Sequence, residues 1–304
     1  MESGIKKTSH VLNHIACELL GMDVGDRMEP ISSIAARLHV SNGTVQNVLR
    51  SLEEQKALHL VARGHLGSFV EQMDSRLLLE CAGISSVFCA MPIPYSKRYE
   101  GLASGLRREI SNLGLSKTGI VFISGSRCRM TALSERRVDA VVMSSLAARH
   151  YMQQGYAIEI LHKFPRGSYI NNHYLITRKG FDLNTSDVIR VGVDEMSYDQ
   201  ALWNQNCFAG KKTQPVPVHY LHVLEHIKTG VIDAAVWSFE DSYLDDELSC
   251  VELHDEAMAE NTSAVLVARR DDAGMVRFLR RNMNFDNIIR IQQAVMQGDQ
   301  LPDY

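Results

Sequence analysis

The feature that most constrains the fold is a series of short, β-branched runs that alternate with amphipathic segments from residue 85 onward. Each run is a few residues long, and most are followed by a stretch of helical periodicity. This pattern is typical of an α/β fold with largely parallel sheets. The predicted strands lie at 85–91, 118–124, 139–145, 157–164, 172–178, 188–194, 213–218, 233–239, 249–253 and 262–270. The predicted helices lie at 98–113, 128–137, 146–154, 197–209, 219–229 and 273–297.

One phrase of this region occurs twice. Residues 132–142 read ALSERRVDAVV, and residues 226–236 read HIKTGVIDAAV, so both end in a similar Asp-Ala phrase. Each copy follows a predicted helix and a turn, and each opens a strand with Asp-Ala. We therefore predict that the two copies are equivalent strands of two similar lobes.

The N-terminal part of the chain has a different pattern. Residues 8–22 place apolar side chains at helical spacing, and residues 31–38 predict a short second helix. Ser41 is the predicted N-cap of a third helix over 44–56, and residues 57–72 alternate as a hairpin does. This order is that of a winged helix-turn-helix, whose third helix enters the major groove of DNA.

The outer face of the third helix carries side chains that suit DNA recognition, since amides pair with adenine edges and Arg contacts phosphate. The predicted DNA-binding residues are Asn42, Thr44, Gln46, Asn47 and Arg50 on the helix and His65 near the hairpin tip. The alternative is a three-helix packing module that does not bind DNA. The first 73 residues carry 7 Lys/Arg and 8 Asp/Glu. We therefore expect modest affinity per monomer and a homodimer on a double-stranded DNA operator.

The segment ISSIAARLHVSNGTVQNVLRSLEEQKALHLVARGHLGSFV (31–70) resembles the winged helix of GntR-type regulators. It departs from that pattern at Asn42 and Gln46, where the family usually has Arg. Two charged contacts are therefore replaced by neutral ones.

The later part of the chain resembles the type 2 periplasmic-binding-protein fold. AMPIPYSKRYEGLASGLRREI (90–110) is similar to its first strand, ligand loop and first helix, and LITRKG (175–180) to its first crossover. IRVGVDEMSYDQ (189–200) is similar to the opening of the second lobe, and SAVLVARRDD (263–272) to the return to the first.

The resemblance narrows to one family. FCAMPIPYSKRYEGLASGL (88–106), with the winged helix upstream and the closing LPDY (301–304), resembles the YhfZ-type regulators, which are GntR-like and have this domain pair. The resemblance implies a winged helix-turn-helix domain over 1–73 and a two-lobed ligand-binding domain over 74–304. In this division the second lobe covers about 181–260, and residues 74–81 are a short amphipathic linker.

Ligands of open α/β sheets bind at the carboxyl ends of strands, beside helix N-termini. Hydroxyl groups and free backbone N–H groups at such points suit a carboxylate or phosphate, and Arg127 or Arg129 can add a positive charge. We therefore predict a small organic anion as effector, bound between the lobes. The alternative is that each serine only caps a helix. The predicted ligand-binding residues are Tyr95, Ser96, Gly125, Ser126, Arg127, Ser144, Ser145, Ser197, Tyr198 and Ser238.

Three histidines, His219, His222 and His226, follow one another at i, i+3 and i+7 on a predicted helix, a spacing that can hold a metal ion. The alternative places them on the solvent side of that helix, opposite a buried face with Leu221, Leu224 and Ile227. No Cys or Asp completes a known metal-ligand spacing, so we predict neither a metal nor a cofactor.

The sequence contains no GxGxxG, GxxxxGK, HExxH or GxSxG motif. We therefore predict that the protein is not an enzyme. The alternative is an enzyme, or a transport-type solute-binding protein, that uses the same two-lobed fold.

The net charge of −4 gives no global basic field, and no apolar stretch approaches the ~18 residues of a membrane helix. The six cysteines form no CxxC pair, and the N-terminus is a poor signal peptide. We predict a cytoplasmic, ligand-responsive transcriptional regulator that binds DNA and no membrane.

Overall fold

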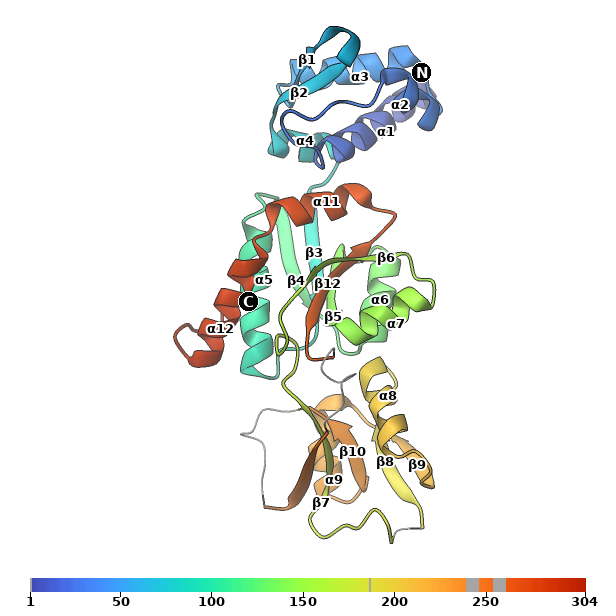
Figure 1. Ribbon diagram of the computed structural model, residues 1–304, viewed down its shortest axis with the longest axis vertical. Helices are drawn as coiled ribbons and strands as arrows, with labels where there is room; N and C mark the ends of the chain where they lie inside the picture. The colour runs from blue at the N-terminus through green and yellow to red at the C-terminus, as the bar shows by residue number, and fades with distance from the viewer. Residues whose placement is uncertain (1, 186, 239–245, 254–260) are drawn as a thin grey trace. The chain divides into compact units, whose positions relative to one another are not determined.

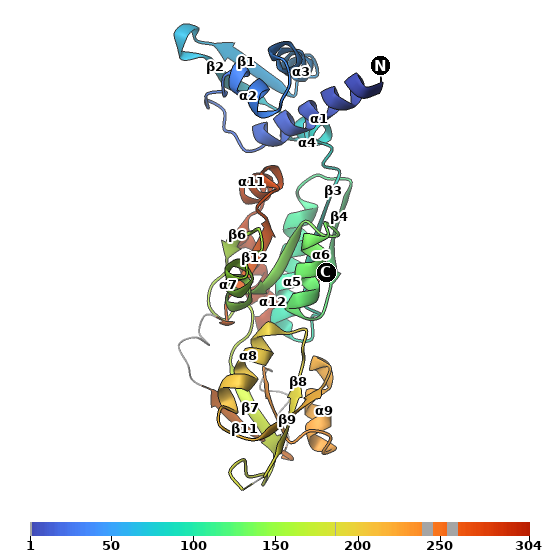
Figure 2. The same ribbon diagram turned by 90° about the vertical axis from the view of Figure 1, so that its right-hand side faces the viewer.

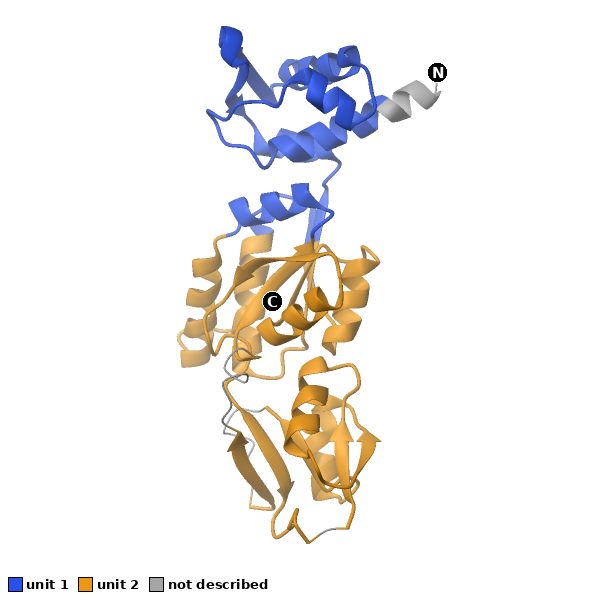
Figure 3. Ribbon diagram, turned by 45° about the vertical axis from the view of Figure 1, so that its right-hand side comes forward, with its two compact units in different colours: residues 1–87, 111–118, 270–283 blue, residues 88–110, 119–269, 284–304 orange. Residues whose placement is uncertain are grey.

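The computed structural model describes residues 2–185, 187–238, 246–253 and 261–304. The chain divides into two compact units (Figure 3). The first contains residues 1–87, 111–118 and 270–283, and the second contains residues 88–110, 119–269 and 284–304.

The winged helix-turn-helix predicted from the sequence is present in the first unit (Figure 1). Its elements are α1 (Glu2–Leu19), α2 (Ile31–Arg37), α3 (Asn42–Glu54), β1 (Leu58–Ala62), the 3₁₀ turn η1 (Gly64–Leu66) and β2 (Ser68–Met73). Ser41 caps α3, because its Oγ accepts a hydrogen bond from the Thr44 N–H at 3.1 Å. Val45, Val48 and Leu52 on the inner face of α3 are buried, as the helical spacing predicts.

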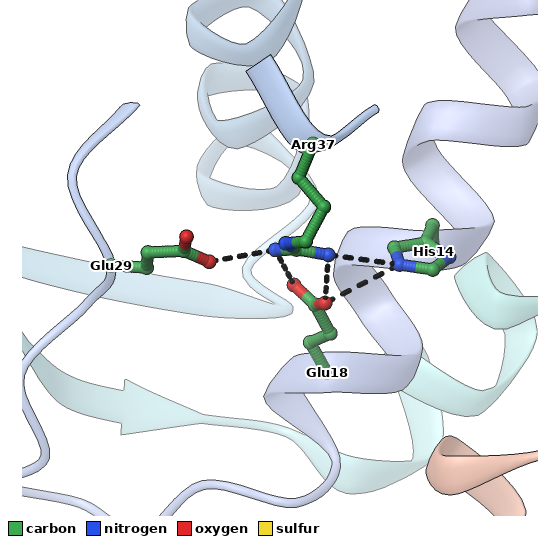
Figure 4. A network of polar contacts seen from close by, with 4 residues as sticks. All are labelled: His14, Glu18, Glu29 and Arg37. Atoms are coloured by element: carbon green, nitrogen blue, oxygen red, sulfur yellow. Dashed lines mark hydrogen bonds and ion pairs between the residues drawn. The ribbon is translucent and has the colours of Figure 1, made fainter. Parts of the chain in front are cut away.

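An ionic network joins the first two helices (Figure 4). The Arg37 guanidinium at the end of α2 donates to Glu18 of α1 at 2.6 Å and to Glu29 of the intervening turn at 2.7 Å. His14 lies 3.1 Å from the same guanidinium. Because these side chains are partly exposed, the network orients α2 on α1 more than it stabilises the fold.

The segment expected to be a linker over 74–81 is a helix, α4 (Ser75–Ala82). Asp74 caps it by accepting hydrogen bonds from the N–H groups of Arg76 and Leu77. The helix packs against α1, and its residues Leu78 and Leu79 are buried. The expectation of a linker was wrong because a capping Asp and a buried leucine pair make a stable helix even at this short length.

A helix from the far end of the chain, α11 (Ala273–Asn282), also belongs to the first unit and packs against α1. Arg281 of α11 forms an ion pair with Asp23 at 2.8 Å and donates to the Met22 carbonyl. Gly274 of α11 lies against Cys17, whose pKa burial raises to about 11. The end of α1 is thus supported by residues that follow it by more than two hundred positions.

Two five-stranded sheets form the two-lobed part (Figure 1). The first has the order β4-β3-β5-β12-β6, with β3 (Ser86–Met91), β4 (Lys117–Phe122), β5 (Ala140–Ser144), β6 (Ile158–Lys163) and β12 (Ala264–Arg269). The second has the order β11-β7-β10-β8-β9, with β7 (His173–Arg178), β8 (Ile189–Val193), β9 (Thr213–Pro217), β10 (Ala234–Trp237) and β11 (Leu248–Leu253). Each strand lies close to its predicted bounds.

The sheets are mixed rather than largely parallel. Strands β3 and β5 are parallel, as are β8 with both β9 and β10. Strand β12 runs antiparallel to both β5 and β6, and β7 runs antiparallel to both β10 and β11. The expectation was wrong for the strands that carry the chain between lobes, because these need no helical crossover and can run antiparallel. The second lobe was predicted to cover about 181–260. Strand β7 already lies in the second sheet, so this lobe begins near His173 instead of 181. The predicted end at 260 lies outside the described residues.

The repeated Asp-Ala phrase has the same structural role in both lobes. Asp139 accepts a hydrogen bond from the Phe88 N–H at 2.9 Å and returns its own N–H to the Phe88 carbonyl at 2.8 Å. Asp233 makes the same two bonds with Arg190, at 2.9 and 2.8 Å. Each Asp therefore fixes the start of a central strand against its parallel neighbour, so the prediction of equivalent strands is confirmed.

Helices cover both faces of the second sheet (Figure 2). Ala234 and Val236 of β10 pack in one cluster with Trp203 of α8 (Tyr198–Cys207), and Ala235 and Trp237 pack in another with α9 (Val223–Lys228). This alternation is the two-residue period of a strand buried on both faces. In the first lobe, α6 (Ser126–Ser134) and α7 (Ser145–Gln153) pack over one face of the sheet.

Two predicted helices differ from expectation. The helix over 219–229 begins as the 3₁₀ turn η2 (Tyr220–His222), and Leu221 is exposed instead of buried. The helix over 273–297 is two helices, α11 and α12 (Phe285–Gln297). The break falls at Met283, whose backbone is extended, and Asn284 then caps α12 by accepting from the Asn287 N–H.

The helix α5 (Lys97–Ser111) approaches α12 unusually closely at Gly101 and Gly105. A Cβ on Gly101 would lie 2.7 Å from the Gln292 carbonyl oxygen, and one on Gly105 would lie 2.6 Å from the Ile288 carbonyl oxygen. The two glycines, four residues apart on one helix face, therefore allow backbone-to-backbone packing.

Candidate functional site

A cavity lies between the two lobes, at the carboxyl ends of β3, β4, β8 and β10. Together with its opening to solvent, it holds about 710 Å³ of space that protein atoms do not occupy. Residues of both lobes line it. They are Pro92, Ile93, Tyr95, Tyr99, Ser124, Gly125, Ser126, Arg129, Tyr169, Ile170, His173, Asp194, Ser197, Asp199, Gln200, Tyr220, Leu221, Val236, Trp237, Ser238 and Asn261.

Arg129 is the buried cation of this cavity. It lies on α6 and is only 2% exposed. Its guanidinium donates to the Ile123 carbonyl at 2.7 Å and to the Tyr169 hydroxyl at 3.1 Å. Its Nε is buried without a hydrogen-bond partner, and no described residue forms an ion pair with it. Because a buried guanidinium without a directly paired carboxylate is costly, this arrangement favours an anionic group beside Arg129.

Two carboxyl groups of the second lobe also line the cavity. Oδ1 of Asp194 accepts a hydrogen bond from the Met196 N–H at 3.0 Å, and burial raises the pKa of Asp194. Burial raises the pKa of Asp199 to about 6, while a hydrogen bond from Ser144 and the charge of Arg129 act in the opposite direction. The cavity therefore has a positive pole on one lobe and a negative pole on the other.

A row of aromatic rings forms one wall of the cavity. Trp237 and Tyr220 of the second lobe lie 5.3 Å apart, and Tyr220 lies 5.5 Å from Tyr95 of the first lobe. The row continues with Tyr99, whose ring centroid lies 5.0 Å from that of Tyr95, and with Tyr169, 5.3 Å from Tyr99. Burial raises the pKa of Tyr99 and of Tyr220, so these hydroxyls are neutral near pH 7. The wall thus provides apolar faces together with hydrogen-bonding edges.

Direct contacts close the two lobes on each other beside the cavity. The Tyr95 hydroxyl donates to the Tyr220 hydroxyl at 3.3 Å, and Oγ of Ser126 accepts from the Tyr198 N–H at 3.3 Å. Gly125, with φ +74°, brings its backbone against Met196, where a Cβ would lie 2.4 Å from the Met196 Cβ. Only glycine fits this approach.

Some of the predicted ligand-binding residues line the cavity and others do not. Those that line it are Tyr95, Gly125, Ser126, Ser197 and Ser238. Ser96 lines a smaller neighbouring cavity of about 220 Å³ together with Tyr95.

Four predicted residues lie outside the cavity lining. Ser144 caps α7 by accepting from the Ala147 N–H at 2.9 Å, and Ser145 is buried. Arg127 is exposed, whereas Arg129, the other arginine considered, lines the cavity. The ring of Tyr198 stacks on His150 at 3.7 Å.

The sequence prediction missed both carboxyl groups and most of the aromatic row. Asp194 and Asp199 stand beside the predicted Ser197, so the rule that selected the strand ends had already located this loop. Tyr99, Tyr169 and Tyr220 come from helices and loops that the rule did not include.

Most of the residues predicted to bind DNA are exposed to solvent in the winged helix. Asn42, Gln46, Asn47 and Arg50 of α3 are exposed, and Oγ1 of the half-buried Thr44 lies 3.0 Å from Oγ of Ser41. His65 is exposed in η1, between the strands of the hairpin. The exposed Arg63, whose guanidinium stacks on Phe69 at 4.6 Å, adds a cation to this hairpin that the sequence analysis overlooked.

The three histidines do not share a helix face. The Nδ1 of His219 accepts from the Leu221 N–H ahead of η2, and the ring centroids are 5.4 Å apart for His219 and His222 and 6.1 Å apart for His222 and His226. Over the described ranges, no group of three or more His, Cys, Asp or Glu side chains is placed to hold a metal ion.

None of the helices in the described part of the chain has the length and apolarity needed to cross a membrane.

Comparison with known proteins places these features in context. Residues 74–304 match the family described as YhfZ C-terminal domain, and residues 23–70 match the family described as helix-turn-helix domain. The chain is 33% identical to the protein YhfZ of Escherichia coli (strain K12), over 99% of this chain and 98% of that one.

Solved structures show the same fold. The crystal structure of YhfZ from Shigella flexneri is 32% identical, with a TM-score of 0.63 over 75% of this chain and 97% of that one. The alkanesulfonate-binding protein SsuA from Xanthomonas axonopodis pv. citri, bound to MOPS, is 11% identical, with a TM-score of 0.53 over 71% of this chain and 75% of that one. The prediction of a winged helix-turn-helix followed by a two-lobed, periplasmic-binding-protein-like domain is therefore confirmed.

Proposed function

Because the chain belongs to the YhfZ family and joins a helix-turn-helix domain to a two-lobed domain, we propose that it is a transcriptional regulator whose affinity for a DNA operator depends on a small organic anion bound between the lobes. The observation that carries the proposal is Arg129, a buried guanidinium with an unpartnered Nε in a cavity shared by both lobes. An anion there contacts both lobes and can favour one arrangement of them. A helix-turn-helix joined to a two-lobed domain is typical of a regulator, and we propose that the protein is not an enzyme.

The effector half of the proposal is tested by ligand binding to the full-length protein. A thermal-shift screen of carboxylates and phosphorylated metabolites should give a compound that raises Tm, since ligand at ~100 times its Kd adds ~2.7 kcal/mol of stability. Arg129→Met should abolish the shift. Arg127→Met, which removes an exposed Arg from the same helix, is the matched control and should retain it. A compound that shifts both variants equally binds elsewhere.

Binding must also change operator affinity. A coupling of ~1–3 kcal/mol, or roughly 5- to 150-fold in Kd, is typical of allosteric proteins. A compound that binds in the cavity without changing operator affinity contradicts the proposal. If that compound is also recovered chemically altered, the result favours an enzyme that uses the same fold.

The DNA half of the proposal concerns α3. Gln46 and Asn47 present exposed amides, which suit adenine edges, and Arg50 suits a phosphate. In gel-shift assays at fixed salt, Gln46→Ala should relax sequence preference, whereas Arg50→Ala should weaken binding to all sequences alike. Gln153→Ala, at an exposed position in α7, is the control and should bind as the parent does. Unchanged binding in both α3 variants would mean that this helix does not read DNA.

We further propose that the protein is a homodimer and acts in the cytoplasm. The near-neutral charge of the first 73 residues gives one winged helix few phosphate contacts, and two copies on a palindrome double them. Light scattering should give twice the chain mass at micromolar concentration; a monomer both on and off DNA would contradict the dimer. Cell fractionation should recover the protein with the cytoplasm.

A further inference from the structure

We infer that the effector is a zwitterion, with its anionic group at Arg129 of the first lobe and an ammonium group at Asp194 of the second. The inference rests on the proposed function, because it assigns the chemical class of ligand to the same cavity. It narrows the expected organic anion to one that also carries a positive charge.

The negative pole of the cavity is the first observation. Asp194 is 9% exposed and lines the cavity. Its Oδ1 accepts the Met196 N–H, but among the described residues no hydrogen-bond donor reaches Oδ2. Acceptor capacity that the protein leaves unused, on a carboxylate facing a cavity, selects a ligand that donates hydrogen bonds.

The charge balance of the cavity is the second observation. Arg129 is the one Lys or Arg among the described lining residues, while Asp194 and Asp199 both carry carboxyl groups there. His173 adds no positive charge, since burial lowers its pKa to about 3. A dicarboxylate would satisfy Arg129 but would place its second charge beside two carboxyl groups of like sign in a desolvated site. A zwitterion meets both poles with opposite charges.

The aromatic wall is the third observation. Tyr95, Tyr220 and Trp237 form a continuous row contributed by both lobes. Aromatic faces attract cations through the ring quadrupole, and they also accept the carbon skeleton of a ligand. The wall therefore suits an ammonium group together with the short chain that connects it to the anion.

The test compares matched ligands on the full-length protein. The probes are the protein L-amino acids, each paired with the acid in which the amino group is replaced by hydrogen, and binding is measured by thermal shift and calorimetry. At least one amino acid should bind at least tenfold more tightly than its des-amino partner. Arg129→Met should lose both ligands.

Asp194→Asn is the decisive variant. It should lose the tenfold preference for the amino acid while its affinity for the des-amino acid stays within twofold of the parent. Glu195→Gln, which neutralises the neighbouring exposed carboxylate, is the control and should keep the preference.

The results that would exclude a zwitterionic effector differ from those that would exclude a regulator. Des-amino acids that bind as tightly as amino acids, and still change operator affinity, overturn the zwitterion and leave the regulator intact. The same is true if no amino acid binds but another anion does so through Arg129. If amino acids bind with the expected preference and operator affinity never changes, the ligand class stands and the proposed regulation falls.

Discussion

Replacing Gly105 by Ala should destabilise the two-lobed part, although alanine is the better helix former. A Cβ at Gly105 would lie 2.6 Å from the Ile288 carbonyl oxygen and 2.8 Å from the Ile288 Cα, where ordinary contact begins at 3.4 Å. Both opposing atoms belong to the backbone of α12, so no side chain can rotate away. The two helices must separate.

The magnitude follows from two opposing terms. The helix propensity of alanine contributes up to ~1 kcal/mol of stability. Overpacking costs ~1–3 kcal/mol, and the upper end applies here because separation also loosens the buried contacts of Leu102, Leu106 and Ile288. We expect a net loss of about 2 kcal/mol, which corresponds to a fall in Tm of about 5 °C.

Differential scanning calorimetry of the full chain measures this change. Gly43→Ala is the matched control, since the nearest atom to its added Cβ is the Ser41 Oγ at 3.8 Å. That substitution should be neutral or raise stability by up to ~1 kcal/mol. A Gly105→Ala protein that melts at or above the parent temperature would show that α5 and α12 do not pack this closely.

Three further predictions concern single polar groups. The pKa of Asp199 is raised from 3.8 to about 6, so its contribution to stability is full below pH 4 and is lost as pH rises through 6. The free energy of unfolding should fall by about 3 kcal/mol over this range. Asp199→Asn should remove that loss, and the Tm should then depend less on pH between 4 and 7. Hydrogen bonds from Arg190 lower the pKa of Asp233, so Asp233→Asn should reduce the free energy of unfolding by about 2 kcal/mol near pH 7. This loss should shrink as pH falls through the lowered pKa, and urea unfolding at pH 7 and pH 3 measures it. Ser41→Ala should cost about 1 kcal/mol by removing the cap at Thr44, and an unchanged unfolding midpoint would show that the cap contributes nothing.

The strands and most helices could be predicted because each has a strong local signal. The β-branched runs, the cap at Ser41 and the repeated Asp-Ala phrase all act within a few residues of one another in sequence. Strand direction could not be predicted in this way. The antiparallel placement of β12 depends on where the chain returns after an entire lobe, and no pattern within 262–270 carries that information.

The candidate cavity was predicted in part for a similar reason. The strand-end rule located Ser126 and Ser197, because it depends only on where strands stop. It could not choose between Arg127 and Arg129, since burial on α6 is set by the packing of the helix on its sheet. It also passed over Tyr220, whose contact with Tyr95 joins residues 125 positions apart.

The placement of α11 beside α1 has a consequence for truncated forms of this protein. A linear division at residue 73 suggests that a late stop codon affects only the ligand-binding part. Loss of the chain from residue 270 onward would instead remove the partner of Asp23 and uncover the surface of α1 around Cys17. Late truncations should therefore damage the DNA-binding end, and an isolated N-terminal fragment ending at residue 87 should be less soluble than the intact chain.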